Sequence, residues 1–514
     1  MSRRVPVARR GRRPTNDEEV SRALRALVLR DRAVRLAGAA LATTLALSLA
    51  ACSGDDPDAS PGSGATDGAT SSTDEPAPDT PTVPPGEQVE LTFGVFGTEA
   101  EVAAYQDVVD AYNAQATSVE VTLRSWPTRG RLLKALEGPA EQRPDVYLLN
   151  RRDLGRVVDD GVNRSLFGLL QARDISYGDG FSQRSIAAFS AQDDLQCIPY
   201  GVSPMVMYYN PDLVDFADMR ERGLPAPDEE LDSWDWQEMA AAVRYAVRKH
   251  PRARGISISP DLESLAPFLY AGGGQVFEGD PPTSLNFSDG TNVDTLAQVL
   301  PLLRNPNLTL SDDQLAKADP VTWFERGRLA MVEGYRSLTP RLREVRGLHF
   351  DVLPMPRLDT DATVGEQEGL CVSPGPKVQP AADFLVYAIS DEGMSTIAET
   401  GYVVPASLGV ARSESFLQPD QQPMHAGVFN AAVDDIQLLP IAPRLKRAEA
   451  LVADDLDLLL HAPVIGDLQS VTERIDETSR SVLDPEYVPE DESTDGASPT
   501  DDASPSDGET SSDG

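Results

Sequence analysis

Few residues of this sequence stand in patterns that could carry out chemistry. The four histidines lie far apart, and no HExxH or similar metal-binding spacing occurs. Neither a GxSxG nucleophile elbow nor a phosphate-binding GxxxxGK[ST] loop is present. Acidic pairs such as Asp193-Asp194 and Asp434-Asp435 would suit a glycosidase, although surface carboxylates are the simpler interpretation. We therefore predict no catalytic residues, no metal site and no cofactor.

The three cysteines, Cys52, Cys197 and Cys371, are too few for a disulfide scaffold, and no CxxC spacing is present. Cys52 ends the sequence Leu49-Ala50-Ala51-Cys52, which follows an apolar run over 36–49 and several arginines. The run suits the core of a signal peptide but is short for a membrane-spanning helix. This pattern resembles a bacterial lipobox, in which the cysteine thiol accepts a diacylglyceryl group; the alternative is a buried helix with an incidental cysteine.

Lipidation of Cys52 predicts a protein anchored to the cell membrane by its lipid, on the extracytoplasmic face. Residues 1–51 would be a signal peptide with a long basic leader, whose paired arginines leave twin-arginine export open beside the general secretory route. Residues 52–88 would be the lipidated cysteine and a disordered tether, because they contain almost no large apolar side chain. Residues 484–514 have the same composition and would be a disordered acidic tail.

The formal net charge of −37 over 514 residues argues against a nucleic-acid partner, which would need lysine and arginine stripes. Between the tails, strand and helix patterns alternate, and this alternation predicts an α/β fold with a largely parallel sheet. The predicted strands are 89–96, 119–123, 144–149, 196–210 and 350–354, and the predicted helices are 100–113, 131–136, 233–248, 264–269, 294–303, 381–389, 444–460 and 467–483.

Several segments in this region resemble, in order and spacing, those of the extracellular solute-binding proteins of ABC importers, in the family that includes maltose-binding protein. The segments are Pro144-Asp145-Val146-Tyr147, Ile198–Pro204 followed by Tyr208–Leu213, Ser233–Met239, Gly272–Gly274, Phe324–Met331 and Asp351–Pro356. No single one of them is specific, and each could be ordinary strand or helix punctuation.

The resemblance implies a two-lobed, periplasmic-binding-protein-like (type II) fold with hinge-connected lobes. Lobe 1 would hold 89–200 and 373–420, and lobe 2 would hold 201–372 and 421–483. A small-molecule ligand, most simply a sugar or oligosaccharide, would bind between the lobes and be delivered to an ABC permease. The chain would act as a monomer and would not be an enzyme. Signalling or scaffolding without transport is the alternative function.

The same resemblance places Cys197 and Cys371 where two strands cross between the lobes, side by side at the hinge. An oxidising exterior would permit a disulfide between them. Two buried free thiols, each packing as a small apolar group, are the alternative.

Candidate ligand-binding residues follow from their positions at strand ends and lobe crossings. Two departures from the family pattern, Gly334-Tyr335-Arg336 after Met331 and Asn150-Arg151-Arg152 after the third strand, replace expected aromatics. The arginines leave open an anionic ligand carrying carboxylate or phosphate. The candidates are Phe96, Thr98, Arg151, Pro204, Tyr208, Glu263, Tyr335, Arg336 and Glu368, with Asn150, Arg152 and Gln367 beside them.

Overall fold

The computed structural model describes residues 88–488, except residues 177, 179, 443 and 463. The predicted signal peptide, the lipidation site at Cys52, almost all of the tether, and the acidic tail from residue 489 lie outside the described residues. Within the described part, no helix is both long enough and apolar enough to cross a membrane.

The first of two sheets has five strands in the order β2-β1-β3-β13-β6. Strands β1, β2 and β3 are parallel, whereas β13 runs antiparallel to both β3 and β6. Every residue of β3 is buried, as expected for a central strand covered on both faces. The bounds are β1 Val89–Phe96, β2 Val119–Trp126, β3 Val146–Asn150, β6 Ile198–Pro204 and β13 Gly365–Val372.

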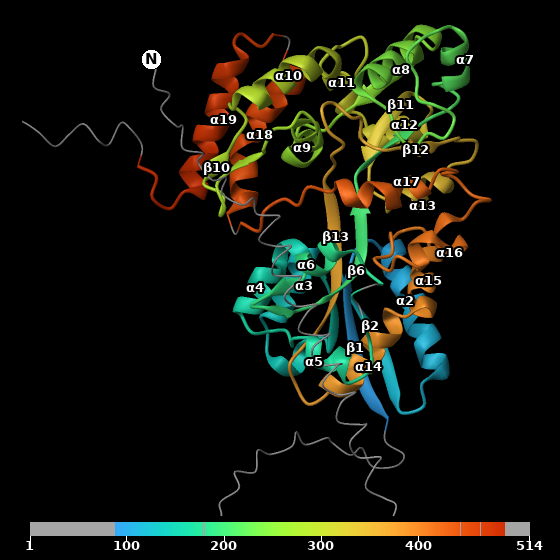
Figure 1. The fold of residues 1–514 in the computed structure, drawn as a ribbon, viewed down its shortest axis with the longest axis vertical. Coiled ribbons are helices and arrows are strands. Elements are labelled where there is room, and N and C mark those ends of the chain that lie inside the picture. Colours follow the sequence, from blue (N-terminus) through green and yellow to red (C-terminus); the bar gives the residue numbers. More distant parts are fainter. Residues whose placement is uncertain (1–87, 177, 179, 443, 463, 489–514) are drawn as a thin grey trace, which may run out of the picture. The chain divides into compact units, whose positions relative to one another are not determined.

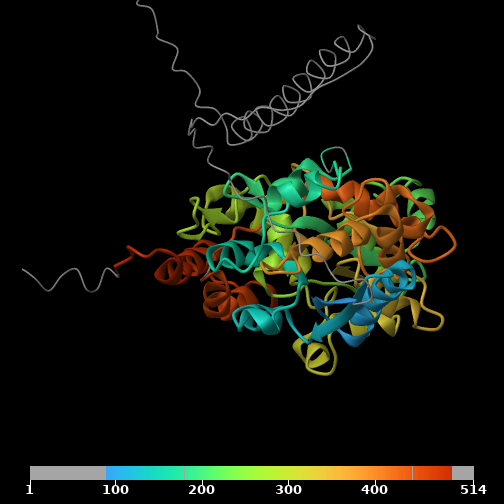
Figure 2. The same cartoon turned by 90° about the horizontal axis from the view of Figure 1, so that it is seen from below.

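Helices cover this sheet and complete the first lobe (Figures 1 and 2). The predicted alternation of strands and helices over the first sixty residues of the domain is confirmed by β1, α2, β2, α3 and β3 in chain order. The helices are α2 Glu99–Gln115, α3 Arg129–Leu136, α4 Leu154–Asp159, α5 Phe167–Gln171, α6 Gln183–Ala188, α14 Val378–Ala388, α15 Asp391–Glu399 and α16 Glu414–Leu417. Three short 3-10 helices and one strand pair lie between these elements: η1 Ala140–Gln142, η2 Arg151–Asp153, η3 Val410–Arg412, β4 Ser190–Ala191 and β5 Asp194–Leu195.

The second sheet has four strands in the order β12-β7-β11-β8. Strands β8 and β11 are parallel, and β7 is antiparallel to its neighbours β11 and β12. The two faces of β7 pack into different hydrophobic cores. Val206 and Tyr208 belong to one core, and Met207 and Tyr209 belong to the other. The bounds are β7 Val206–Tyr209, β8 Arg254–Ser257, β11 Leu329–Gly334 and β12 Asp351–Leu353.

The second lobe is mainly helical around this sheet (Figure 1). Its helices are α7 Phe216–Glu221, α8 Trp236–Lys249, α9 Leu262–Ala271, α10 Gly290–Leu303, α11 Asp312–Leu315, α12 Pro320–Glu325, α13 Leu338–Arg343, α17 Gly427–Ala431, α18 Leu445–His461 and α19 Leu468–Leu483, with η4 Ala432–Asp435 and the strands β9 Phe277–Glu278 and β10 Ser284–Leu285. Buried Asp476 fastens α19 to the strand region before α10 by accepting hydrogen bonds from the backbone N–H groups of Phe287 and Ser288 at 2.7 and 2.8 Å.

The two lobes are joined by strands that run from one sheet towards the other. Strand β6 leads into β7 with only Met205 between them, and β13 returns the chain to the first sheet (Figure 1). A third segment lies alongside, where Thr363 pairs with Ile436. The lobe boundaries predicted from the sequence stay predictions.

A disulfide joins Cys197, directly before β6, to Cys371 within β13. Both cysteines are fully buried, and their Cα atoms are 4.5 Å apart. Of the two sequence alternatives, the structure therefore has the bridge and not two free thiols. The cysteines are 174 positions apart in the sequence. The bridge therefore links the place where the chain leaves the first sheet to the place where it returns.

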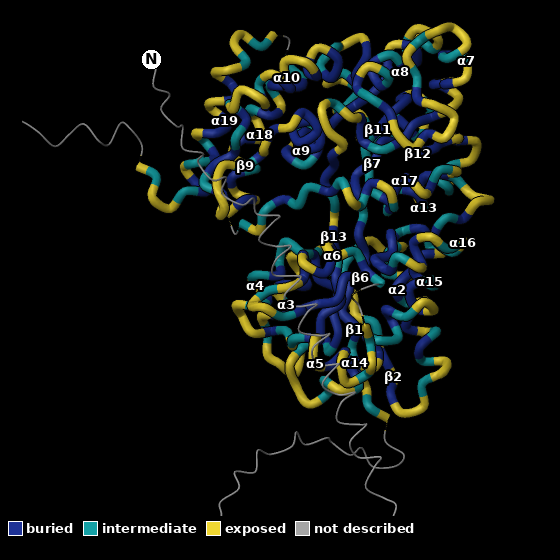
Figure 3. The backbone as a smooth tube through the Cα atoms, in the orientation of Figure 1, coloured by how far each residue is buried: buried dark blue, intermediate teal, exposed yellow. Residues whose placement is uncertain are grey.

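The first sheet carries a dense apolar core, visible as buried backbone in Figure 3. The rings of Phe93 and Phe384 meet edge to face at 5.3 Å, which ties β1 to α14. Truncating a buried phenylalanine of this kind to alanine lowers the free energy of unfolding by about 3–5 kcal/mol, so this contact contributes substantially to the stability of the sheet.

Candidate functional site

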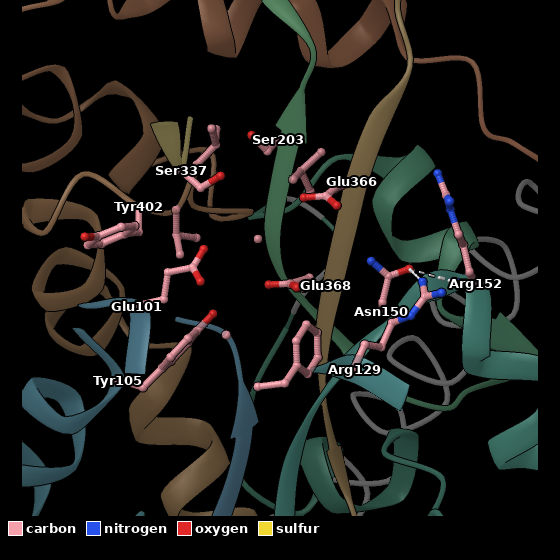
Figure 4. Close-up of a pocket in the computed structure, with 16 residues that line it drawn as sticks. Glu101, Tyr105, Arg129, Asn150, Arg152, Ser203, Ser337, Glu366, Glu368 and Tyr402 are labelled. Carbon is pink, nitrogen blue, oxygen red and sulfur yellow. Dashed lines mark hydrogen bonds between the residues drawn. The ribbon is translucent and has the colours of Figure 1, made fainter. Parts of the chain in front are cut away.

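A cavity of about 410 Å³ lies at the carboxyl ends of β1 and β3. This is within the range of about 300–1,000 Å³ that small-molecule sites occupy, and strand ends are where α/β sheets bind ligands. Figure 4 shows polar side chains from several elements around it. The lining residues are Phe96, Gly97, Glu101, Tyr105, Arg129, Asn150, Arg152, Gly201, Val202, Ser203, Ser337, Glu366, Glu368, Tyr402, Val403 and Val404.

Glu101 is held at the cavity by the way α2 begins. Thr98 is the N-cap of α2: its hydroxyl accepts a hydrogen bond from the Glu101 N–H, and Glu101 Oε2 accepts one from the Thr98 N–H at 2.7 Å. Gly97, with φ +144, allows the tight approach, since a Cβ there would lie 2.7 Å from Glu101 Oε2. Thr98 therefore positions a lining carboxylate and is not among the lining residues itself.

Glu366 and Glu368 enter the cavity from β13 (Figure 4). They are two residues apart in one strand, so their side chains leave the same face. Burial, with the negative charges of Glu366 and Glu101 nearby, raises the pKa of Glu368 to about 8, although the Tyr105 hydroxyl donates a hydrogen bond to it. Glu366 is exposed to the cavity, yet the surrounding walls and Glu263 raise its pKa to about 6.

The two arginines that line the cavity are each bound to a carboxylate. Arg129 Nε lies 3.2 Å from Asp153 Oδ2. Arg152 Nη2 lies 3.3 Å from Glu263 Oε2. Burial lowers the pKa of Arg152, but the charge of Glu263 outweighs that effect and the pKa is raised overall. Both guanidinium groups are therefore held in place by an ion pair.

Asn150 organises the turn that carries Arg152 and also contacts Arg129 at the start of α3. Its side-chain oxygen accepts hydrogen bonds from the Arg152 N–H at 3.1 Å and from Arg129 Nη1 at 3.3 Å. This contact caps the 3-10 helix η2 at the end of β3. Figure 4 shows Asn150 and Arg129 together on one side of the cavity, with Glu101 and Tyr402 on the other.

A polar bridge connects this region to the second sheet. Glu263, near the start of α9, is paired with Arg152 and also accepts a hydrogen bond from the Tyr335 hydroxyl. Next to it, Arg151 Nη1 donates to the carbonyl oxygen of Leu439 at 2.8 Å. Burial lowers the pKa of Arg151 to about 10. The structure thus brings together Arg152, Glu263 and Tyr335, which sequence position alone had proposed as cleft residues.

Not every predicted residue points into the cavity. The Tyr208 side chain is fully buried, and its hydroxyl interacts with Tyr335 O at 2.8 Å and Thr339 Oγ1 at 2.9 Å. Arg336 is also fully buried, with its guanidinium 4.7 and 5.3 Å from the ring centres of Phe416 and Phe429.

Burial lowers the pKa of Arg336 to about 10, and its Nε and Nη1 atoms have no hydrogen-bond partner among the described residues. Pro204 is buried at the end of β6, and Gln367 is buried between the two glutamates of β13. None of Tyr208, Arg336, Pro204 and Gln367 lines the cavity, whereas Phe96, Asn150, Arg152 and Glu368 do.

Sequence reasoning missed Glu101, Arg129, Glu366, Ser337 and Tyr402. Two of them carry a signal that could have found them. Thr98 and Glu101 form the Ser/Thr-x-x-Glu pattern of a capping box, which places a carboxylate next to the end of β1. Glu366 shares its strand face with Glu368 by the two-residue period. Tyr402 and Ser337 have no comparable signal, because tertiary packing brings their loops to the cavity.

Residues 107–422 match the sequence pattern of the bacterial extracellular solute-binding proteins. The match spans more than half of the chain and includes most of the cavity lining and every strand of the two sheets except β1. The chain belongs to the bacterial extracellular solute-binding proteins. A search among curated proteins gives no match for this solute-binding protein.

Solved structures of similar fold agree with this assignment. An ABC substrate-binding protein of Listeria monocytogenes, solved with cycloalternan, is 17% identical with a TM-score of 0.63, over 76% of this chain and 99% of the other. The GacH receptor of Streptomyces glaucescens, solved without ligand and with acarbose, is 17% identical with a TM-score of 0.62, over 77% and 98%. The UspC protein of M. tuberculosis is 13% identical with a TM-score of 0.60, over 76% and 100%.

The expected family and the two-lobed α/β fold are therefore confirmed for this solute-binding protein. It is an extracellular binding component, and its relatives by fold and family bind solutes instead of transforming them. In the described part of the chain, no group of three or more histidines, cysteines or acids is arranged to hold a metal ion.

Proposed function

We propose that this solute-binding protein takes a sugar or oligosaccharide into the cavity between β1, β3 and β13 and passes it to an ABC permease. The observation that carries the proposal is the mixture of groups around the cavity: carboxylates that accept hydrogen bonds, guanidinium and amide groups that donate them, and the rings of Phe96 and Tyr402. Sugar hydroxyls both donate and accept, and pyranose faces stack on rings, so such a lining suits them.

Two fold neighbours support the same ligand class, since they were solved with cycloalternan and with acarbose. An anionic solute is less well supported than the sequence suggested. Arg129 and Arg152, the arginines at the cavity, are already paired with Asp153 and Glu263. A carboxylate or phosphate would have to break those pairs and would meet three glutamates.

We also propose that a lipid on Cys52 holds the protein, as a monomer, at the extracytoplasmic face of the membrane. Loss of the thiol in Cys52→Ser should release the protein into the medium or leave it unprocessed. Mass spectrometry of the N-terminal peptide from the native protein should show a diacylglyceryl-modified cysteine. An unmodified Cys52 in membrane-bound protein would contradict this part of the proposal.

The ligand proposal is tested by thermal melts of the purified protein against mono- and oligosaccharides, amino acids, polyamines and phosphate compounds. A ligand present at 100 times its dissociation constant should stabilise the native state by about 2.7 kcal/mol. Tyr402→Ala should weaken binding of the sugar that gives the shift. Tyr387→Ala, on α14 outside the cavity lining, is the matched control. If no sugar shifts the melt of folded protein, carbohydrate binding is refuted.

A further inference from the structure

The charges that line the cavity do not balance. Three carboxylates, Glu101, Glu366 and Glu368, face two guanidinium groups, Arg129 and Arg152. Figure 4 shows the three glutamates in the central and left parts of the view, and the arginines grouped on the right. The two kinds of charge are therefore separated across the cavity.

Each of these two arginines forms an ion pair with an acidic residue that does not line the cavity. Asp153 pairs with Arg129 at 3.2 Å, and Glu263 pairs with Arg152 at 3.3 Å. Among the described residues, by contrast, no Lys or Arg nitrogen lies within 4.0 Å of a carboxylate oxygen of Glu101, Glu366 or Glu368. The Thr98 N–H and the Tyr105 hydroxyl donate hydrogen bonds to Glu101 and Glu368, while Arg129 and Arg152 act on Glu366 and Glu368 only from beyond ion-pair distance.

The second sheet carries a further buried carboxyl, Glu333, outside the lining of the cavity. Glu333, at the end of β11, accepts a hydrogen bond from the Ser259 N–H at 3.1 Å, and the Ser264 side chain also lies near its carboxyl group. Burial, together with the charges of Asp261 and Glu263, raises the pKa of Glu333 to about 8. A carboxyl with this pKa is largely protonated at neutral pH, so the negative charge of the cavity comes from the glutamates of its own lining, and such a charge concentrates cations.

A neutral sugar would leave this repulsion in place, because hydroxyl groups cannot neutralise carboxylates. An ammonium group placed between Glu366 and Glu368 would make charge-assisted hydrogen bonds to both and would remove the repulsion. Arg129 and Arg152 act on these carboxylates only at longer range, because each is paired with another acid, so a positive charge in direct contact has to come from the solute.

We infer that the solute is a cationic carbohydrate, an amino sugar whose ammonium group binds between Glu101, Glu366 and Glu368. The inference rests on the proposed function, because it names the class of sugar at the same cavity. Ring and hydroxyl contacts would come from Tyr402, Phe96 and the arginine side, while the glutamates select for the amine.

The test uses a matched series of sugars and isothermal calorimetry on the purified protein. Mono- and disaccharides that carry an amine at C2 or C6 are compared with their hydroxyl parents, their N-acetyl derivatives and the C6 uronic acids. Spermidine serves as a cation without a sugar. The titrations are run at about pH 6.5, because the neighbouring oxygens make a sugar amine less basic than a lysine side chain and the amine must be protonated. We expect an amino sugar to bind at least about tenfold more tightly than its parent, the ratio given by 1.4 kcal/mol.

The carboxylates are tested with Glu366→Gln and Glu368→Gln, which keep side-chain size and remove charge. Each should abolish the preference for the amine, measured in the same variant as the ratio of the affinities for the amino sugar and its hydroxyl parent. Glu90→Gln, an exposed residue at the opposite end of β1, is the control and should change neither. Binding of the amine should also release protons, seen as a heat that depends on the buffer's ionisation enthalpy, because the ammonium favours the charged carboxylates.

The outcomes separate this inference from the proposed function. Equal or tighter binding of hydroxyl, N-acetyl or uronic sugars would overturn the inference and keep carbohydrate binding. An amine preference that survives in both glutamine variants would also overturn it. Binding of spermidine with no sugar of any kind would refute carbohydrate as the ligand and retain the cationic site. Failure of every amine to bind to folded protein would eliminate the cationic site.

Discussion

Removing the Cys197–Cys371 bridge should destabilise the protein more than most single contacts can. The bridge closes a loop of about 174 residues. In the chain-entropy model, a loop of that length gives a stabilisation of about 5 kcal/mol, because the cross-link restricts the unfolded chain. Residues 197 and 371 flank the whole β7–β12 region, so the unfolded state of the Cys197→Ala/Cys371→Ala variant gains the freedom of that entire segment.

The assay is equilibrium unfolding in urea, followed by fluorescence and by circular dichroism. The double variant should have a lower free energy of unfolding and a larger m value, because its unfolded state is less compact. Wild-type protein unfolded in the presence of reductant is the control that separates the cross-link from the side-chain change. A loss below about 1 kcal/mol, with coincident transitions and an unchanged m value, would refute the loop-entropy reasoning.

Three further perturbations test other parts of the structure. The pKa of Glu368 in the folded protein is about 8, above the ordinary value of 4.5. The stability that the protonated carboxyl contributes is therefore fully present below pH 4.5 and is lost as the pH rises through 8. Glu368→Gln should therefore raise the melting temperature at about pH 9 and leave it unchanged at about pH 4. Asp476→Ala should cost about 3 kcal/mol in urea unfolding, because the backbone N–H groups of Phe287 and Ser288 lose a charged acceptor; a loss under about 1 kcal/mol would contradict this. Arg336→Met should change stability little or increase it by up to about 2 kcal/mol, since it removes a buried charge with unpaired N–H groups; a large loss on unfolding would show that the ring contacts dominate.

Local patterns predicted much of the fold. Alternating apolar residues in 89–96 and the helical spacing after Thr98 are properties of the sequence itself, and the observed β1 and α2 follow them. The long predicted strand over 196–210 is β6 and β7 with a single residue between them. The boundary between the two strands at the crossing could not be predicted from the pattern, because both strands are buried along almost their whole length.

The candidate site was predicted only in part, because a sequence shows which residue follows a strand but not which way its side chain turns. Phe96 and Glu368 do line the cavity. Arg336 stands directly after Tyr335, yet one side chain packs in the core while the other reaches Glu263. A charged residue in a loop suggests exposure, and only the packing of Phe416 and Phe429 explains why Arg336 is buried.

The sequence by itself determined the order of elements, the family resemblance, the pair of cysteines at the crossing and the absence of recognised catalytic motifs. Those features depend on short-range periodicity and on residue types. Only the tertiary structure decided that Glu101 and Glu368, 267 positions apart in the chain, face one cavity, and that Arg129 and Arg152 are neutralised by Asp153 and Glu263. The charge of a binding site is the sum over residues that folding brings within a few ångströms of one another, and no local pattern contains that sum.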